Sequence, residues 1–305
     1  MGINSNTIKS IWVLENIHKD KKFFMKEIEF LYLIASITQW KKFYPSIPTY
    51  LVCTHDVHSY LYDLDLIYLW DYVDLNILSD QDEIDRSIFW ACSKVKAMKN
   101  ISTPFVLIDN DLYIKNQIAD SKDFDEFDVI ISHEEYGPGY YPLASDNIFK
   151  DLKNKHQTDY AGRSYNVSFL YMKNEDFKIK YAERSFEWMA TLSENKKKNP
   201  DLVLHGGHMI FCEQKLLYDM SKADNIQVKS IIPDIFDCKK NIFLSQSKIQ
   251  SQIDHLGPLK RHIEYNGEIY LNRKSDVLVN IRDYPNLKNI FNALKRGKDM
   301  HGIIL

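Results

Sequence analysis

Two aspartates follow directly on an apolar run in the sequence FVLIDNDLY, residues 105–113. Asp109 and Asp111 are two residues apart, and the side chains of such residues point to the same side of an extended chain. Two carboxylates held close together repel each other unless a cation joins them, and carboxylate oxygens suit Mg²⁺ and Mn²⁺. The pattern has two interpretations. It is either a site for a divalent metal that in turn binds a diphosphate, or an ordinary Asp-Asn-Asp turn.

The elements that must position these aspartates alternate between strands and helices. Short apolar runs predict strands at 10–14, 49–53 and 105–108, and 65–70 is expected to lead into another strand. Helices are predicted over 21–43, with Phe24 and Ile28 on one face, for a short stretch after residue 53, and over 80–100. Such alternation is typical of a mostly parallel sheet flanked by helices, and ligands bind such sheets at the carboxyl ends of the strands, where Asp109 and Asp111 lie.

The composition excludes some classes of function. The 305 residues include 39 Lys and Arg against 42 Asp and Glu, and a formal charge of -3 gives no basic field for nucleic acid. The four cysteines are scattered without a CxxC pair, so a zinc site or a disulfide framework is not expected. Apolar runs fall short of the ~20 residues that span a bilayer, and the N-terminus has no apolar signal segment. We therefore expect a cytoplasmic protein with no nucleic-acid partner.

Together with the aspartate pair, three later segments resemble motifs of the GT-A fold nucleotide-sugar glycosyltransferases, in particular the glycogenin-like retaining enzymes of glycosyltransferase family 8. The segment YNVSFLYMKN (165–174) is similar to the stretch in which an asparagine precedes a strand near the donor sugar. GGHMIFCEQKLL (206–217) resembles the "DQ" helix of that family, with Glu in place of Asp. HLGPLK (255–260) resembles a one-residue-shorter form of the segment that holds metal and diphosphate, and the usual Pro-Trp after it is absent.

The resemblance, which covers residues 8–262, implies a role for each matching position. It implies metal ligation by Asp109, Asp111 and His255, and nucleotide-sugar contacts by Lys260, Gly257 and Asn110. The catalytic group would comprise Asp109, Asp111, Asn166, Glu213 and Gln214. Lys94, one helical turn after Trp90 and shortly before the aspartate strand, would either reach the ribose or diphosphate or be an ordinary solvated lysine.

For the whole protein, the resemblance implies an α/β fold of GT-A type (Rossmann-like), with a mixed, mostly parallel sheet flanked by helices and a C-terminal extension. Residues 1–262 would form the glycosyltransferase domain, and 263–305 an extension that packs on the domain or on a membrane surface. The implied activity is that of a hexosyltransferase (EC 2.4 class) of polysaccharide biosynthesis. It would use Mn²⁺ or Mg²⁺ and a UDP-sugar donor, and its acceptor would be a glycan or a lipid-linked molecule.

Several alternatives stay open at the level of sequence. A haloacid dehalogenase-type phosphatase also carries DxD after a buried strand, although Tyr113 stands where that pattern usually has Thr or Val. A catalytically inactive nucleotide- or glycan-binding module is the third class. An inverting enzyme would need a carboxylate base, for which Glu213, Glu134 and Glu135 are candidates.

The remaining polar motifs each have an ordinary structural interpretation. His255 is either a metal ligand or a loop histidine beside a glycine turn. THDVH (54–58) is expected to cap a helix, and HGGH (205–208) to form a turn that enters one. The C-terminal segment 287–296 has one apolar face, which would pack on the domain or give peripheral contact with the inner face of the membrane.

Overall fold

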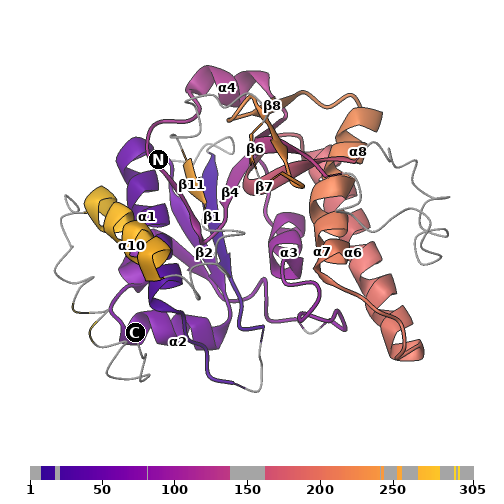
Figure 1. Cartoon of the computed structure of the whole chain (residues 1–305), viewed down its shortest axis with the longest axis horizontal. Helices are drawn as coiled ribbons and strands as arrows, with labels where there is room; N and C mark the ends of the chain where they lie inside the picture. Colours follow the sequence, from indigo (N-terminus) through magenta and orange to yellow (C-terminus); the bar gives the residue numbers. More distant parts are fainter. Residues whose placement is uncertain are drawn as a thin grey trace. The chain divides into compact units, whose positions relative to one another are not determined.

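The structure is a computed structural model (Figure 1), and it describes residues 8–17, 21–80, 82–137, 162–240, 242–243, 253–255 and 267–281, with residues 292 and 295. The chain forms two compact units. The terminal unit, as we call it, combines residues 7–76, 107–118 and 251–305. The central unit combines residues 77–106 and 119–250 with residues 1–6.

The terminal unit contains three parallel strands. β1 (Lys9–Leu14) pairs with β2 (Thr49–Cys53), and β2 pairs with β3 (Tyr72–Asp74). The strands predicted at 10–14 and 49–53 are confirmed, because their apolar residues are buried as expected. The stretch 65–70 leads into a strand as expected: residues Ile67–Leu69 form the 3-10 helix η1, and β3 follows it.

Three helices accompany these strands: α1 (Glu27–Phe43), α2 (His55–Asp63) and α10 (Gly267–Ile281). The prediction that a helix begins at residue 21 is wrong, since α1 begins after Lys26, whose backbone N–H donates to the Glu29 carboxylate at 3.4 Å. Phe24 therefore lies outside the helix and is 54% exposed. From Phe30 to Ala35 every residue of α1 is buried, as in a helix covered on all sides. α10 and β5 both contact α1, and α10 lies beside it in Figure 1.

β4 (Phe105–Ile108) is the predicted strand before the aspartates, and all four of its residues are buried. A turn connects it to β5 (Leu112–Ile114), which pairs antiparallel with β11 (Ile253–His255). This pairing brings residues from distant parts of the sequence side by side within the terminal unit.

The central unit contains a second group of strands, built around β6 (Val129–Tyr136). β7 (Arg163–Met172) pairs antiparallel with β6, with an irregularity of register between Ile131 and His133. β8 (Val228–Ser230) and β9 (Ile235–Asp237) both pair parallel with β6, and β10 (Ile242–Phe243) pairs antiparallel with β9. The predicted α/β class, with mixed, mostly parallel strands flanked by helices, is confirmed.

The helices of the central unit include two that pack on each other, α3 (Cys92–Asn100) and α6 (Glu175–Lys198). The others are α4 (Ser121–Glu126), α7 (Gly206–Ile210) and α8 (Leu216–Ala223), with the π-helical segment η2 (Phe211–Lys215) between the last two. The predicted helix start at residue 80 is wrong. The Asp82 carboxylate accepts from the Ile84 backbone N–H, and such a local side-chain-to-backbone hydrogen bond competes with helix formation.

Candidate functional site

Asp109, Asp111 and His255 form a compact group in the terminal unit. One potential ligand atom from each lies within 4.8 Å of the others. Among the described residues, this is the one group of three or more His, Cys, Asp or Glu side chains close enough together to hold a metal ion. His255 Nε2 lies 3.3 Å from Asp111 Oδ1 and 4.0 Å from Asp109 Oδ2. Asp111 is buried, whereas Asp109 and His255 are partly exposed. Two carboxylates and an imidazole provide the mixed oxygen and nitrogen donors that suit Mn²⁺.

A turn, and not an extended chain, brings the two aspartates together. The Leu112 backbone N–H donates to the Asp109 carbonyl at 3.1 Å, which closes a four-residue turn between β4 and β5. The expectation that Asp109 and Asp111 converge because the chain is extended is therefore wrong in its geometry. The two interpretations of the tripeptide are compatible: the segment is a turn, and its carboxylates face one imidazole.

Asn110, at the corner of the same turn, anchors it to β1. Its Nδ2 atom donates to the Val13 carbonyl at 2.9 Å. Its Oδ1 atom is buried and accepts no hydrogen bond from the described residues. One end of the amide thus has a structural role, and the other is an acceptor available to a bound group.

His255 reaches the aspartates because β11 pairs with β5. In the register of this pair, His255 lies opposite Leu112 and Asp254 lies opposite Tyr113. Lys260 and Gly257, which the resemblance assigns to the nucleotide-sugar, lie outside the described residues.

Asp254 is a residue that sequence analysis missed. It is only 5% exposed and accepts hydrogen bonds or ion pairs from four side chains of the terminal unit: Arg273, Tyr32, Lys115 and Tyr113. One signal in the sequence could have indicated Asp254: it is an acidic residue directly before a candidate histidine ligand. Neighbouring residues of a strand face opposite ways, so the two side chains would have different surroundings.

In the central unit, Lys94 and Glu213 form an ion pair. Lys94 Nζ lies 2.8 Å from Glu213 Oε1, and both side chains are largely buried. Lys94 Nζ also donates to the Val167 carbonyl at 3.4 Å. Of the two alternatives for Lys94, the ordinary solvated lysine is therefore wrong. Lys94 is the cationic partner of the glutamate that the resemblance assigns to catalysis.

Glu213 and Gln214 lie in the π-helical segment η2. Two hydroxyls of α6 bind backbone carbonyls here: Tyr181 donates to that of Glu213 and Ser185 to that of Cys212, both at 2.8 Å. The Gln214 Oε1 atom is buried and accepts no hydrogen bond from the described residues. Single π-helical turns inside α-helices are frequent at functional sites, because the extra residue redirects the side chains that follow.

Asn166 lies beside Glu135 in the central unit. Asn166 Nδ2 donates to Glu135 Oε1 at 2.9 Å, and its Oδ1 accepts from the Ser168 hydroxyl at 2.6 Å. The Cys238 thiol donates to the other oxygen of Glu135, and burial, followed by the charge of that carboxylate, raises the pKa of Cys238 to about 12. Glu134 instead pairs with Arg163 at 2.6 Å. Of the two, Glu135 is the buried carboxylate, and His133 Nε2 also lies 3.5 Å from its Oε1.

The segment HGGH enters a helix as expected, but the helix begins earlier than a turn over 205–208 would allow, since α7 starts at Gly206. His205 is the N-cap residue of α7, and its Nδ1 atom accepts from the Gly207 backbone N–H at 3.1 Å. Thr54 likewise occupies the N-cap position of α2, but its hydroxyl donates to Asp56 at 2.6 Å and makes no cap hydrogen bond to the helix.

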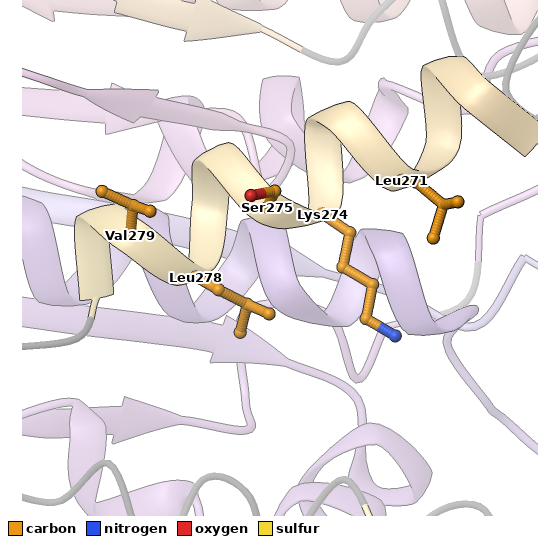
Figure 2. A pocket seen from close by; sticks show the side chains of 5 residues that line it. All are labelled: Leu271, Lys274, Ser275, Leu278 and Val279. Carbon is orange, nitrogen blue, oxygen red and sulfur yellow. The ribbon is translucent and has the colours of Figure 1, made fainter.

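A groove runs along α10 in the terminal unit. Figure 2 shows the five side chains that line it: Leu271, Lys274, Ser275, Leu278 and Val279. Leu271 and Val279 are 63% and 54% exposed. The amphipathic segment 287–296, predicted to pack on the domain or touch a membrane, lies outside the described residues except for 292 and 295. Within the part of the chain that the structure describes, no helix is both long and apolar enough to span a bilayer.

The protein is thus an α/β protein with a candidate site for a divalent cation at the end of a buried strand. The chain belongs to DUF6734, a family of unknown function, whose model matches residues 6–280. No curated protein matches the sequence.

Several solved structures resemble this chain at low identity. Mouse xyloside xylosyltransferase 1 is 10% identical over 73% of this chain and 84% of its own, with a TM-score of 0.38. Core-mannan synthase A from Aspergillus fumigatus, in an Mn/GDP form, is 10% identical over 75% and 74%, with a TM-score of 0.42. A nucleoside-diphosphate-sugar pyrophosphorylase from Vibrio cholerae RC9 is 8% identical over 79% and 98%, with a TM-score of 0.38.

Proposed function

We propose that this protein is a metal-dependent glycosyltransferase of GT-A type. It transfers a sugar from a nucleoside-diphosphate donor, a UDP-sugar, to a glycan or lipid-linked acceptor in polysaccharide biosynthesis. The observation that carries the proposal is the meeting of Asp109, Asp111 and His255 directly after the buried strand β4. The carboxyl ends of strands are where α/β proteins bind ligands.

The chemistry of sugar transfer explains why these residue types are needed. Departure of a nucleoside diphosphate leaves negative charge on the phosphate oxygens, and fixed positive charge at that place stabilises the transition state. A bound Mn²⁺ or Mg²⁺ supplies this charge as a Lewis acid. Asp109, Asp111 and His255 would hold the ion, and Lys260, by the resemblance, would add a second cation at the diphosphate.

By the resemblance, Asn166, Glu213 and Gln214 would take part in catalysis. Asn166 and Gln214 offer amides, and the buried Gln214 Oε1 atom is an acceptor for a sugar hydroxyl. Lys94 holds the Glu213 carboxylate in one orientation through their 2.8 Å contact. In a retaining reaction the leaving phosphate oxygen takes the proton of the acceptor, whereas an inverting reaction needs a carboxylate base, for which Glu213 and Glu135 are the buried candidates.

Metal-dependent nucleotide binding tests this function. The full chain is titrated with UDP in the presence and absence of Mn²⁺, and its melting temperature is followed. A panel of UDP-sugars is then assayed for hydrolysis and transfer. We expect UDP to raise the melting temperature when Mn²⁺ is present, and one UDP-sugar to be turned over.

The same assay separates the alternatives. Stabilisation without turnover of any donor indicates a binding module. Release of phosphate from simple monoesters, with no nucleotide binding, indicates a phosphatase and overturns the proposal.

A further inference from the structure

We propose that Asp254 and Arg273 are positioning residues of the metal centre: their ion pair fixes the short strand β11 so that His255 faces Asp109 and Asp111. The inference rests on the proposed metal-dependent function. In this inference α10, which belongs to the segment 263–305 predicted to be an extension, helps to position a metal ligand.

The strand that carries His255 is only three residues long. β11 pairs with β5 through Ile253, Asp254 and His255, so few backbone hydrogen bonds hold its register. Neighbouring residues of a strand point to opposite faces. Asp254 can therefore be anchored on one face while His255 is presented on the other.

The Asp254 carboxylate is held from three elements. Arg273 of α10 donates through Nη1 to both of its oxygens, at 2.9 and 2.7 Å, and Tyr32 of α1 donates to Oδ1 at 3.0 Å. Lys115, directly after β5, lies 3.1 Å from Oδ2. A buried carboxylate is stable when it is paired and hydrogen-bonded, and this one has both kinds of partner.

The phenol of Tyr32 stays a neutral donor in this arrangement. Burial, and after it the charge of Asp254, raises the pKa of Tyr32 well above its usual value. The Tyr32 hydroxyl therefore keeps its proton and continues to donate. The Tyr113 hydroxyl, 3.5 Å from Asp254 Oδ2, is a second phenolic donor to the carboxylate.

Helix α10 is itself fixed within the terminal unit. Lys274 donates to Glu27 of α1 at 3.0 Å, and the Gln39 amide of α1 donates to the Asn280 carbonyl. These contacts fix the position of α10 and so of Arg273. Arg273 in turn binds Asp254, which fixes the backbone next to His255. Metal ligands need this support, because a centre is built correctly only when its ligands are held within about 0.5 Å.

Manganese affinity of the full chain tests the inference. Binding of Mn²⁺ is measured for the wild type and for Asp254→Asn, Arg273→Lys and Tyr32→Phe, with melting temperature recorded in parallel. We expect Asp254→Asn to weaken binding by about 10- to 100-fold, as is typical for residues that orient metal ligands. Tyr32→Phe, which removes one hydroxyl, should weaken it less. If Asp254→Asn does not fold, Arg273→Lys provides the same comparison with the charge retained.

Two controls separate positioning from general stability. Asp71→Asn removes contacts to Thr49 and Lys41 that do not involve β11 or α10, and it should lower the melting temperature without changing Mn²⁺ affinity. In a His255→Ala background, Asp254→Asn should cause no further loss of affinity, because it acts through that histidine. If Asp254→Asn and Arg273→Lys bind Mn²⁺ as tightly as the wild type does, the inference is overturned and the proposed function is not. Absence of Mn²⁺ binding by the wild type overturns both.

Discussion

The ammonium of Lys94 lies 2.8 Å from Glu213 Oε1, so a cation of α3 neutralises a carboxylate of the π-helical segment η2. Their side chains are 13% and 7% exposed. A pair so little exposed costs desolvation energy, and each charge depends on the other. The contact also ties α3 to the one turn of the α7–η2–α8 helix whose hydrogen-bond pattern is irregular.

Loss of this cation should destabilise the fold. In Lys94→Met the Glu213 carboxylate stays buried without its ionic partner, and we expect a loss of about 3 kcal/mol in the free energy of unfolding, measured in urea. The double variant Lys94→Met/Glu213→Gln removes both charges and should recover part of that loss. If the two effects simply add, the buried pair does not act as a unit.

Loss of a candidate metal ligand should change binding and spare the fold. Asp111→Asn removes one carboxylate from the group with Asp109 and His255. We expect Mn²⁺-dependent binding of UDP to weaken by on the order of 100-fold or more, since even residues behind the ligands account for 10- to 100-fold. The melting temperature without metal should not fall, because one source of repulsion is gone. Asp63→Asn, an exposed change in α2, serves as the control.

A side chain at Gly206 should be tolerated poorly. A Cβ atom at this position would lie 2.9 Å from Cη2 and 3.1 Å from Cζ3 of the Trp90 ring, closer than van der Waals contact. We expect Gly206→Ala to lower the free energy of unfolding by about 1–3 kcal/mol, as overpacking usually does. The second variant Gly206→Ala/Trp90→Leu should regain stability relative to Gly206→Ala. A Gly206→Ala protein as stable as the wild type would show that the ring moves aside freely.

Asp71 should make the stability of the terminal unit depend on acid pH. Burial alone would raise the pKa of its carboxyl, but hydrogen bonds from the Thr49 backbone and hydroxyl and from Lys41, at 2.8–2.9 Å, outweigh it and lower the pKa. A carboxyl with a lowered folded-state pKa contributes stability above its unfolded value of about 3.9, and this contribution is lost as pH falls through the folded value.

The substitution Asp71→Asn isolates that contribution. At pH 7 we expect the variant to be less stable than the wild type by about 1 kcal/mol, the net worth of a hydrogen bond to a partly exposed group. The difference between the two proteins should shrink as pH falls below about 4. Urea titrations at a series of pH values measure it, and a difference that is constant with pH would argue against an ionic origin.

The sequence predicted the strands better than the helix starts. β1, β2 and β4 are short apolar runs buried as the pattern requires, whereas α1 and α3 begin later than predicted. The reason is local: Asp82 and Glu29 bind nearby backbone N–H groups, and hydropathy patterns do not record such hydrogen bonds.

The candidate site was predicted only in part, for a different reason. Asp109 and Asp111 were singled out because their residue types and spacing suit a metal, and His255 because its segment resembles a glycosyltransferase motif; the structure brings the three side chains together. Asp254 and Arg273 were missed because their contact depends on β11 pairing with β5 and on the position of α10. A three-residue strand has no measurable periodicity, and its pairing is fixed by tertiary contacts alone.

The hydrogen-bonded turn from Asp109 to Leu112 also acts as a spacer of fixed length. Because side chains alternate along a strand, one residue inserted between Asn110 and Leu112 would shift β5 by one position against β11 and exchange the faces of Leu112 and Tyr113. Asp254 would then face a different side chain, and His255 would lose its register with the aspartates. The tripeptide Asp-Asn-Asp is therefore constrained in length as well as in residue type, and an insertion there should be less tolerated than a conservative substitution.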